Sequence, residues 1–153
     1  MSTQQDNKII KIAFASDHAG FKLKDELLEY LKSKGYQTID LGPDTDQQPS
    51  SYAFYGKKLA HQLLDNQADL GIGVCGTGLG ISYALNRFKH IRAARVVNEN
   101  DAYLAKVHND ANAIALSGRF TSFEEAKRLV DTFLATKYEG GRHQTRINEL
   151  DTD

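Results

Sequence analysis

Short apolar segments alternate with amphipathic helical segments along almost the whole chain, and this alternation limits the possible folds more than any other feature. The segments expected to be strands are 9–15, 36–41, 70–74, 91–96 and 113–116, and helical spacing of apolar residues marks 21–34, 55–64, 78–88, 98–107, 122–134 and 142–150. Strands that alternate with helices form parallel βαβ units. We therefore predict an α/β fold: a single-domain, Rossmann-like three-layer sandwich around a five-stranded parallel sheet.

The length, ends and charge of the chain agree with one globular domain. A length of 153 residues permits a sizeable core. Residues 1–8 are polar and lack the apolar stretch of a signal peptide, so we expect a disordered extension followed by one domain over 9–153. No apolar run approaches the roughly 18 residues of a membrane span. The net charge of −1 offers no general attraction for nucleic acid or an anionic membrane.

A glycine-rich loop, residues 74–80 (Val-Cys-Gly-Thr-Gly-Leu-Gly), falls where the third predicted strand meets a helix. Its glycines let the backbone approach a ligand and leave amide groups free at a helix N-terminus, which favours an anion. The dinucleotide-binding pattern is excluded because Ile81 replaces its last glycine, and a Walker loop because no Gly-Lys-Ser/Thr follows. A phosphate and a developing oxyanion both remain as the anion.

The only cysteine, Cys75, lies in this loop. It cannot form an internal disulfide, which fits a reducing cytoplasm. Lone cysteines are usually small buried apolar side chains, and the glycines could serve only to pack a helix tightly on a strand. Thiols beside helix N-termini, however, ionise more readily than free ones, and the same amides could stabilise an enediolate. The local pattern leaves both interpretations open.

Basic and imidazole side chains supply further candidates. If 142–150 is helical, Arg142 and Arg146 lie one turn apart and can grip a phosphate, although a solvated basic helix end has the same pattern. Arg119, after the fifth strand, is a third candidate arginine.

In such folds ligands bind outside the carboxyl ends of the strands. We expect this crevice to be lined by Asp17-His18, residues 75–80, and the loops after Val96 and Leu116, with His108-Asn109-Asp110 there as well. The imidazoles could move protons near neutral pH. No spacing of histidine and cysteine resembles a zinc motif, so no metal is expected.

Four motifs together resemble the type B ribose-5-phosphate isomerases, in a family that also includes galactose-6-phosphate and allose-6-phosphate isomerases. The motifs are Asp17-His18-Ala19-Gly20, Cys75-Gly76-Thr77-Gly78-x-Gly80 with Asn86, His108-Asn109-Asp110-x-Asn112, and Gly140-Gly141-Arg142-His143-x-x-Arg146. The resemblance extends from about residue 11 to residue 150. It implies an enzyme that interconverts aldose and ketose phosphates without metal or organic cofactor, as a homodimer or homotetramer with its site between two subunits.

The resemblance also implies a role for each matching residue. Cys75 would be the base that moves the proton, and His108 the acid that opens the sugar ring with help from Asp17. The enediolate would be held by the loop residues Gly76, Thr77, Gly78, Leu79 and Gly80. Asn109 would bind a hydroxyl, and the phosphate would be gripped by His18, Arg119, Arg142 and Arg146. Some of these arginines would serve the site of the partner subunit.

Two comparisons within the resembled family bear on the substrate. One branch has a glutamate base just beyond the glycine loop, where this chain has Ile81, so Cys75 is the expected base. Relatives commonly have Asp-Tyr-Pro-x-Tyr where this chain has Ser51-Tyr52-Ala53-Phe54-Tyr55. Ribose 5-phosphate is the expected substrate, a hexose 6-phosphate is the alternative, and a non-catalytic sugar-phosphate-binding regulator is the more distant one.

Overall fold

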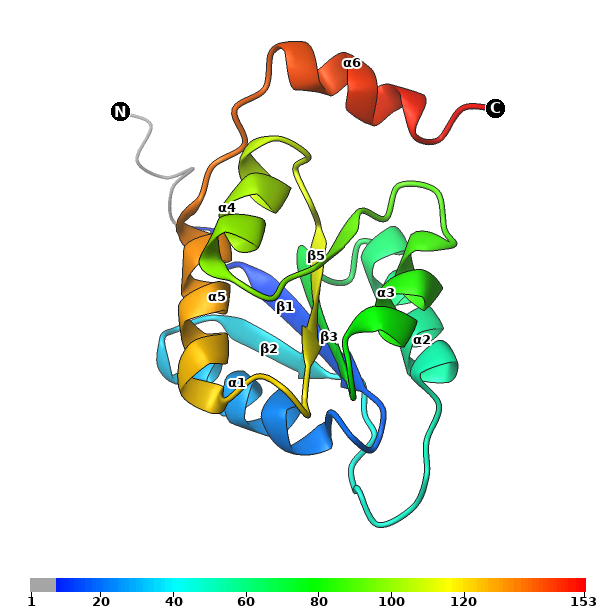
Figure 1. The fold of residues 1–153 in the computed structure, drawn as a ribbon, viewed down its shortest axis with the longest axis vertical. Helices are drawn as coiled ribbons and strands as arrows, with labels where there is room; N and C mark the ends of the chain where they lie inside the picture. The colour runs from blue at the N-terminus through cyan, green and yellow to red at the C-terminus, as the bar shows by residue number, and fades with distance from the viewer. Residues whose placement is uncertain (1–7) are drawn as a thin grey trace.

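The computed structural model describes residues 8–153 and contains one parallel sheet with strand order β2-β1-β3-β5-β4 (Figure 1). The strands are β1 (Lys11–Ser16), β2 (Gln37–Asp40), β3 (Leu70–Cys75), β4 (Ala93–Arg95) and β5 (Ala113–Ser117). The predicted α/β class and five-stranded parallel sheet are confirmed. The expected disordered extension lies outside the described residues, except for Lys8.

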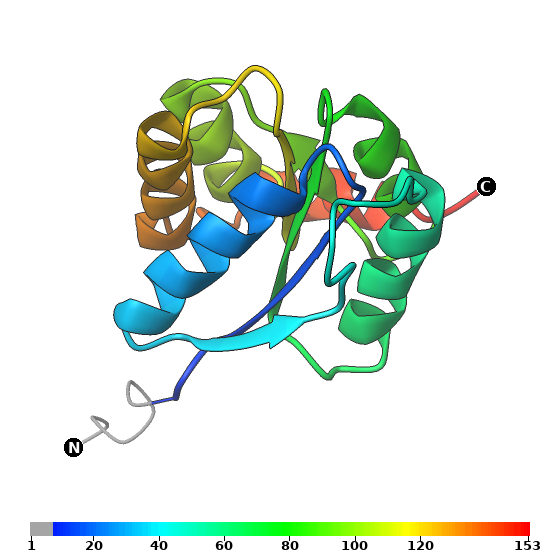
Figure 2. The same ribbon diagram turned by 90° about the horizontal axis from the view of Figure 1, so that it is seen from below.

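Helices cover both faces of the sheet, which makes the three predicted layers (Figure 2). On one face lie α1 (Phe21–Ser33), α4 (Glu99–Val107) and α5 (Phe123–Ala135), and on the other α2 (Tyr52–Leu64) and α3 (Leu79–Asn86). The last helix, α6 (Arg142–Glu149), lies across the edge of the sheet where the strands begin (Figure 1). No helix in residues 8–153 is both long enough and apolar enough to cross a membrane.

The apolar strands are explained by burial on both faces. In β1, Ile12 and Phe14 pack into the core under α1, α4 and α5, whereas Ala13 and Ala15 belong to the core under α2 and α3. A strand buried on both faces has no polar alternation, which is typical of parallel sheets. The central strand β3 carries glycines on the α2–α3 side, and a methyl group on Gly73 would lie 3.1 Å from Ile81 Cδ1. Helix α3 therefore packs closely on β3.

Helix starts follow the capping chemistry of the sequence. Ser122 Oγ accepts a hydrogen bond from the Glu125 amide at 3.1 Å, as the predicted cap of α5 requires. Ser51 Oγ accepts from the amides of Ala53 and Phe54. Because Ser51 caps the helix, α2 begins at Tyr52, three residues earlier than its apolar spacing predicts.

A buried lysine fixes the loop between β2 and α2. The Lys24 side chain is fully buried, and its Nζ donates to Asp40 Oδ1 at 2.7 Å and to the Pro43 carbonyl at 2.9 Å. It also lies 3.2 Å from Asp25 Oδ1, so the buried charge is paired. The loop is thereby held against α1 on its way to the candidate site.

Substitution of Gly20 by alanine should destabilise the protein by about 1–3 kcal/mol, because an added methyl group would overpack this site. Its Cβ would lie 2.3 Å from the Val74 carbonyl oxygen, where α1 begins against β3. Urea unfolding measures the effect. Lys22→Ala, on the exposed side of the same helix, is the control and should change the free energy of unfolding by less than about 0.5 kcal/mol. An unchanged urea midpoint for Gly20→Ala would contradict this close approach.

Candidate active site

The candidate residues divide into two groups that lie at opposite edges of the sheet. The carboxyl-edge group follows the ends of β1, β3 and β5 and consists of Asp17, His18, the loop 75–80 and Arg119. The amino-edge group surrounds the end of α4 and the start of α6 and consists of His108, Asn109, Glu139, Arg142, His143 and Arg146. Each group is described in turn.

Cys75 ends β3 in the carboxyl-edge group. It is 3% exposed, and its Sγ accepts a hydrogen bond from the Gly78 amide at 3.2 Å. Gly78 has a φ of +81°, a conformation that side chains disfavour, and it stands directly before α3. The thiol therefore lies at the N-terminus of a helix with one amide already directed at its sulfur.

Hydrogen bonds from the neighbouring strand ends hold the loop around Cys75 in place. The Gly76 carbonyl accepts from Ser117 Oγ at 2.7 Å and from the Arg119 amide at 3.1 Å. Arg95 Nε donates to the Thr77 carbonyl at 3.0 Å, while Thr77 Oγ1 accepts from the Leu79 amide. With its carbonyls bound to the protein, the loop presents a fixed shape to a ligand.

Charged and imidazole side chains flank this loop. Asp17 is 7% exposed and its Oδ1 accepts from the Gly20 amide at 2.9 Å. The Ser50 amide donates to His18 Nδ1 at 3.1 Å, so the loop tethered by Lys24 also orients this imidazole. The Arg119 guanidinium lies against Gly76, where an added methyl group would be 3.0 Å from its central carbon. The predicted neighbours of Cys75 are thus brought together.

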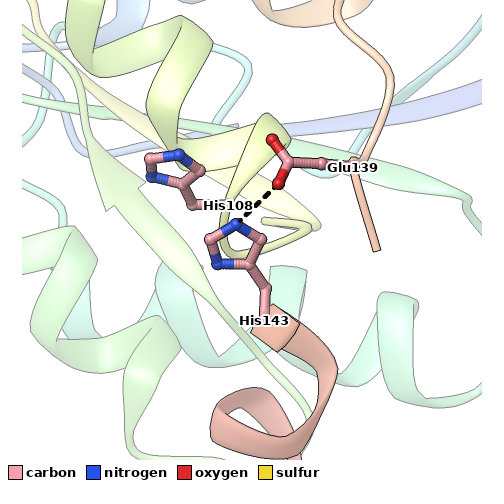
Figure 3. Close-up of side chains that lie close together, drawn as sticks. All are labelled: His108, Glu139 and His143. Atoms are coloured by element: carbon pink, nitrogen blue, oxygen red, sulfur yellow. Dashed lines mark hydrogen bonds and ion pairs between the residues drawn. The ribbon is translucent and has the colours of Figure 1, made fainter. Parts of the chain in front are cut away.

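The amino-edge group contains a pair of stacked imidazoles (Figure 3). The rings of His108 and His143 have centroids 4.5 Å apart and planes inclined by 24°. Glu139 Oε2 lies 3.2 Å from His143 Nε2 and 3.3 Å from Arg142 Nη1. Arg146 stands one turn further along α6, as the sequence predicts, and its Nη1 donates to the Arg142 carbonyl.

The expectation that His108 and Asn109 line the crevice at the carboxyl ends of the strands is wrong for a single chain. Helix α4 runs back from the end of β4 to the start of β5, so its last residues lie at the amino edge. Ser117, at the other end of β5, pairs with Cys75. A strand of that length separates its ends by roughly 13 Å. In one chain the proposed acid, His108, and the proposed base, Cys75, therefore lie at opposite edges of the sheet.

Glu139 and His143 were not among the predicted site residues. His143 is 9% exposed, which is low for a histidine of a polar helix. The glycines before it, Gly140 and Gly141, have φ values of +74° and +64° and turn the chain so that His143 meets His108. The glycine pair is the one signal in the sequence that a sharp turn precedes this helix.

A cavity lies beside the amino-edge group, and exposed apolar side chains lie at the carboxyl-edge group. A cavity of about 360 Å³ between α3, β4 and α6 is lined in part by Arg92, Asn109 and Leu150, and by no residue of the carboxyl-edge group. At the carboxyl-edge group, the exposed aromatic ring of Tyr52 packs against Gly80, and Leu79 of the loop is also exposed. Both surfaces leave apolar groups uncovered in a single chain.

Comparison with known proteins identifies the family of this chain. The family model described as Ribose/Galactose Isomerase matches residues 12–150. The chain belongs to the ribose/galactose isomerase family. Among curated members, the chain is 41% identical to ribose-5-phosphate isomerase B of Escherichia coli K12 over 140 residues, which cover 92% of this chain and 93% of that protein.

Solved structures of ribose/galactose isomerase family members share the fold. A ribose 5-phosphate isomerase from Thermotoga maritima superposes with a TM-score of 0.92 at 46% identity, covering 94% of this chain and 99% of that one. Ribose-5-phosphate isomerase B from Mycoplasma genitalium, solved with bound ribulose-5-phosphate, has a TM-score of 0.88 at 42% identity and covers 92% and 93% of the two chains. The predicted resemblance is confirmed.

Proposed function

We propose that this protein is a type B ribose-5-phosphate isomerase that interconverts ribose 5-phosphate and ribulose 5-phosphate. The observation that carries the proposal is the position of Cys75, buried at the end of β3 with its sulfur 3.2 Å from the Gly78 amide. The relative from M. genitalium, which matches this chain over nearly its whole length, was solved with ribulose-5-phosphate. The free thiol fits a reducing compartment such as the cytoplasm.

The proposed reaction moves one proton between neighbouring carbons. The Cys75 thiolate removes the proton from C2 of the open-chain aldose, and the electron pair forms an enediolate whose oxygen is stabilised by the loop amides and the Thr77 hydroxyl. The thiol then returns the proton to C1 while the proton of the C2 hydroxyl passes to the C1 oxygen, which gives the ketose. Before this, His108 opens the furanose ring by protonating its ring oxygen as the anomeric hydroxyl loses its proton, with Asp17 assisting and Asn109 binding a hydroxyl.

The two groups of residues form one site when two chains associate. In one chain they lie at opposite edges of the sheet, so we propose that the carboxyl-edge group of each subunit faces the amino-edge group of its partner. The exposed apolar side chains of Tyr52 and Leu79 at the carboxyl-edge group, and the cavity beside the amino-edge group, support such an interface. His18 and Arg119 would then grip the phosphate together with Arg142 and Arg146 of the other subunit.

Replacement of His108 by asparagine should slow turnover of ring-closed ribose 5-phosphate and spare that of an acyclic substrate. The imidazole is needed only to open the ring, a step worth about 10²–10⁴-fold when general acid catalysis supplies it. Steady-state rates on ribose 5-phosphate and on an aldose phosphate that cannot cyclise measure the difference. Equal loss on both would contradict the ring-opening role.

Replacement of Arg146 by alanine should raise KM more than it lowers kcat. The guanidinium is proposed to hold the phosphate, which does not take part in the proton transfer. Arg128→Ala is the matched control, because Arg128 is an exposed arginine on α5. An unchanged KM for Arg146→Ala would remove that residue from the phosphate site.

The substrate itself is tested by kcat/KM values measured side by side on ribose 5-phosphate, allose 6-phosphate and galactose 6-phosphate. The hexose phosphates remain the second candidate because Ser51-Tyr52-Ala53 departs from the common motif at a place where Tyr52 contacts Gly80 of the catalytic loop. Ser51 still caps α2, so the change leaves the helix start intact. A higher kcat/KM on a hexose phosphate would replace the pentose assignment.

A further inference from the structure

The side chains in Figure 3 form a donor set for a divalent transition-metal ion. One ligand atom each of His108, Glu139 and His143 lies within 4.8 Å of the others. Two imidazoles and a carboxylate are a donor set found in zinc sites that keep a fourth position open. We propose that this cluster, the amino-edge triad, binds Zn²⁺ or an ion of similar preference, and that the bound ion inhibits the enzyme by occupying His108.

The distances between the triad's ligand atoms, and the exposure of the Glu139 side chain, would allow the triad to close around an ion. Zinc bonds to nitrogen and oxygen are about 2.0–2.2 Å long, so ligand atoms around a tetrahedral ion lie roughly 3.5 Å apart. His143 Nε2 and Glu139 Oε2 are already 3.2 Å apart. The Glu139 side chain is 46% exposed, so it can turn toward an ion held at the ring nitrogens. His143, with an 11% exposed side chain, supplies the fixed ligand.

The charges around the triad determine how tightly it is expected to bind an ion. Arg142 Nη1 lies 3.3 Å from Glu139 Oε2, and an incoming dication must compete with this guanidinium for the carboxylate. Both imidazoles must also be neutral to coordinate. The triad should therefore bind more weakly than a closed structural zinc site and release its ion to a chelator.

The bound ion would inhibit the enzyme because it would prevent His108 from opening the sugar ring. This inference rests on the proposed function. A histidine whose nitrogen holds a metal ion cannot hand a proton to the ring oxygen from that atom. Zn²⁺ should therefore slow turnover of ring-closed ribose 5-phosphate more than turnover of an acyclic substrate. A chelator should restore the rate.

Metal binding is tested without any substrate. Zn²⁺ is titrated into the metal-free full chain by calorimetry, and Co²⁺ binding is followed by visible absorption. One ion per chain is expected, and Glu139→Gln and His143→Asn should each weaken binding by at least about tenfold, the loss that even indirect partners of a metal cause. Glu139→Gln is the safer variant because it changes an exposed side chain. Cys75→Ser and His90→Ala, which alter the thiol and the imidazole beside Asp151, should bind as the wild type does.

The outcomes separate the metal site from the proposed function. Unchanged affinity in Glu139→Gln, or affinity lost in Cys75→Ser or His90→Ala, would overturn the triad as the site. Triad-dependent binding without slower turnover would overturn the inhibition alone. If the protein had no isomerase activity on any sugar phosphate, the proposed function would fail, while the calorimetric result would still decide the metal site.

Discussion

Replacement of Cys75 by alanine is expected to lower kcat for isomerisation by about 10²–10⁴-fold, the usual contribution of a positioned base, while sugar-phosphate binding survives. The sulfur is the group proposed to carry the proton between carbons. The phosphate and hydroxyl contacts come from other residues, so the variant should still bind. Rates measured in both directions, with calorimetric binding of ribulose 5-phosphate, test both halves of the expectation.

Solvent deuterium gives the Cys75 experiment a second readout. In heavy water the wild-type enzyme should incorporate deuterium at the sugar carbon, whereas Cys75→Ala should leave the carbon unlabelled although the sugar is bound. Ser82→Ala is a suitable control, since it shortens another small buried side chain. Ser82 Oγ donates to the Leu79 carbonyl at 2.7 Å, and both residues belong to α3. Near-normal turnover in Cys75→Ala would refute the assignment of the base. Absence of labelling by the wild-type protein would favour a non-catalytic regulator.

The second large effect is recovery of activity when two inactive variants are mixed. Cys75→Ala lacks the base and His108→Asn lacks the acid, so each homodimer should be nearly inactive on ring-closed ribose 5-phosphate. In a mixed dimer, one site combines the altered residue 75 of one subunit with the altered residue 108 of the other, so it carries both defects. The second site combines the intact Cys75 and the intact His108. With random reassociation of a two-fold symmetric dimer, about a quarter of the wild-type activity should return.

The mixing experiment tests the arrangement of the site independently of its chemistry. A site built within one chain would leave both variants inactive however they are combined. Reassociation must be verified, for example by native mass spectrometry of variants with different masses. A mixture of Cys75→Ala with Cys75→Ser is the matched control and should show no recovery, because no mixed dimer then contains an intact base.

Much of the fold could be predicted from the sequence, because its three central strands, β1, β3 and β5, are buried on both faces. The apolar segment ending at Ala15 and the glycine loop after Val74 each mark the end of a parallel strand, and both lie at the carboxyl edge as expected. Some boundaries differ from those predicted. The cap at Ser51 moves the start of α2 to Tyr52, and β4 is only three residues long where six were expected.

For the candidate site, the structure bears on the arrangement of the predicted residues, and part of that arrangement was implicit in the sequence. His108 ends the helix that leads into the fifth strand, and the connection into a parallel strand lies at the amino edge. Its separation from Cys75 was therefore implicit in the order of elements. The contact of His108 with His143 could not be inferred from the order of the elements. It depends on the turn at Gly140 and Gly141, whose direction is a matter of backbone conformation and side-chain packing.

The placement of the two groups at opposite edges of one sheet has a consequence for how such enzymes can diversify. In the proposed dimer each chain contributes only half of any one site, so half of its catalytic residues are redundant once a second, diverging copy of the gene exists. One copy could lose its thiol loop and the other its arginine helix, and the pair would still retain one complete site. The geometry therefore permits an obligate partnership of two unequal subunits to evolve by loss alone.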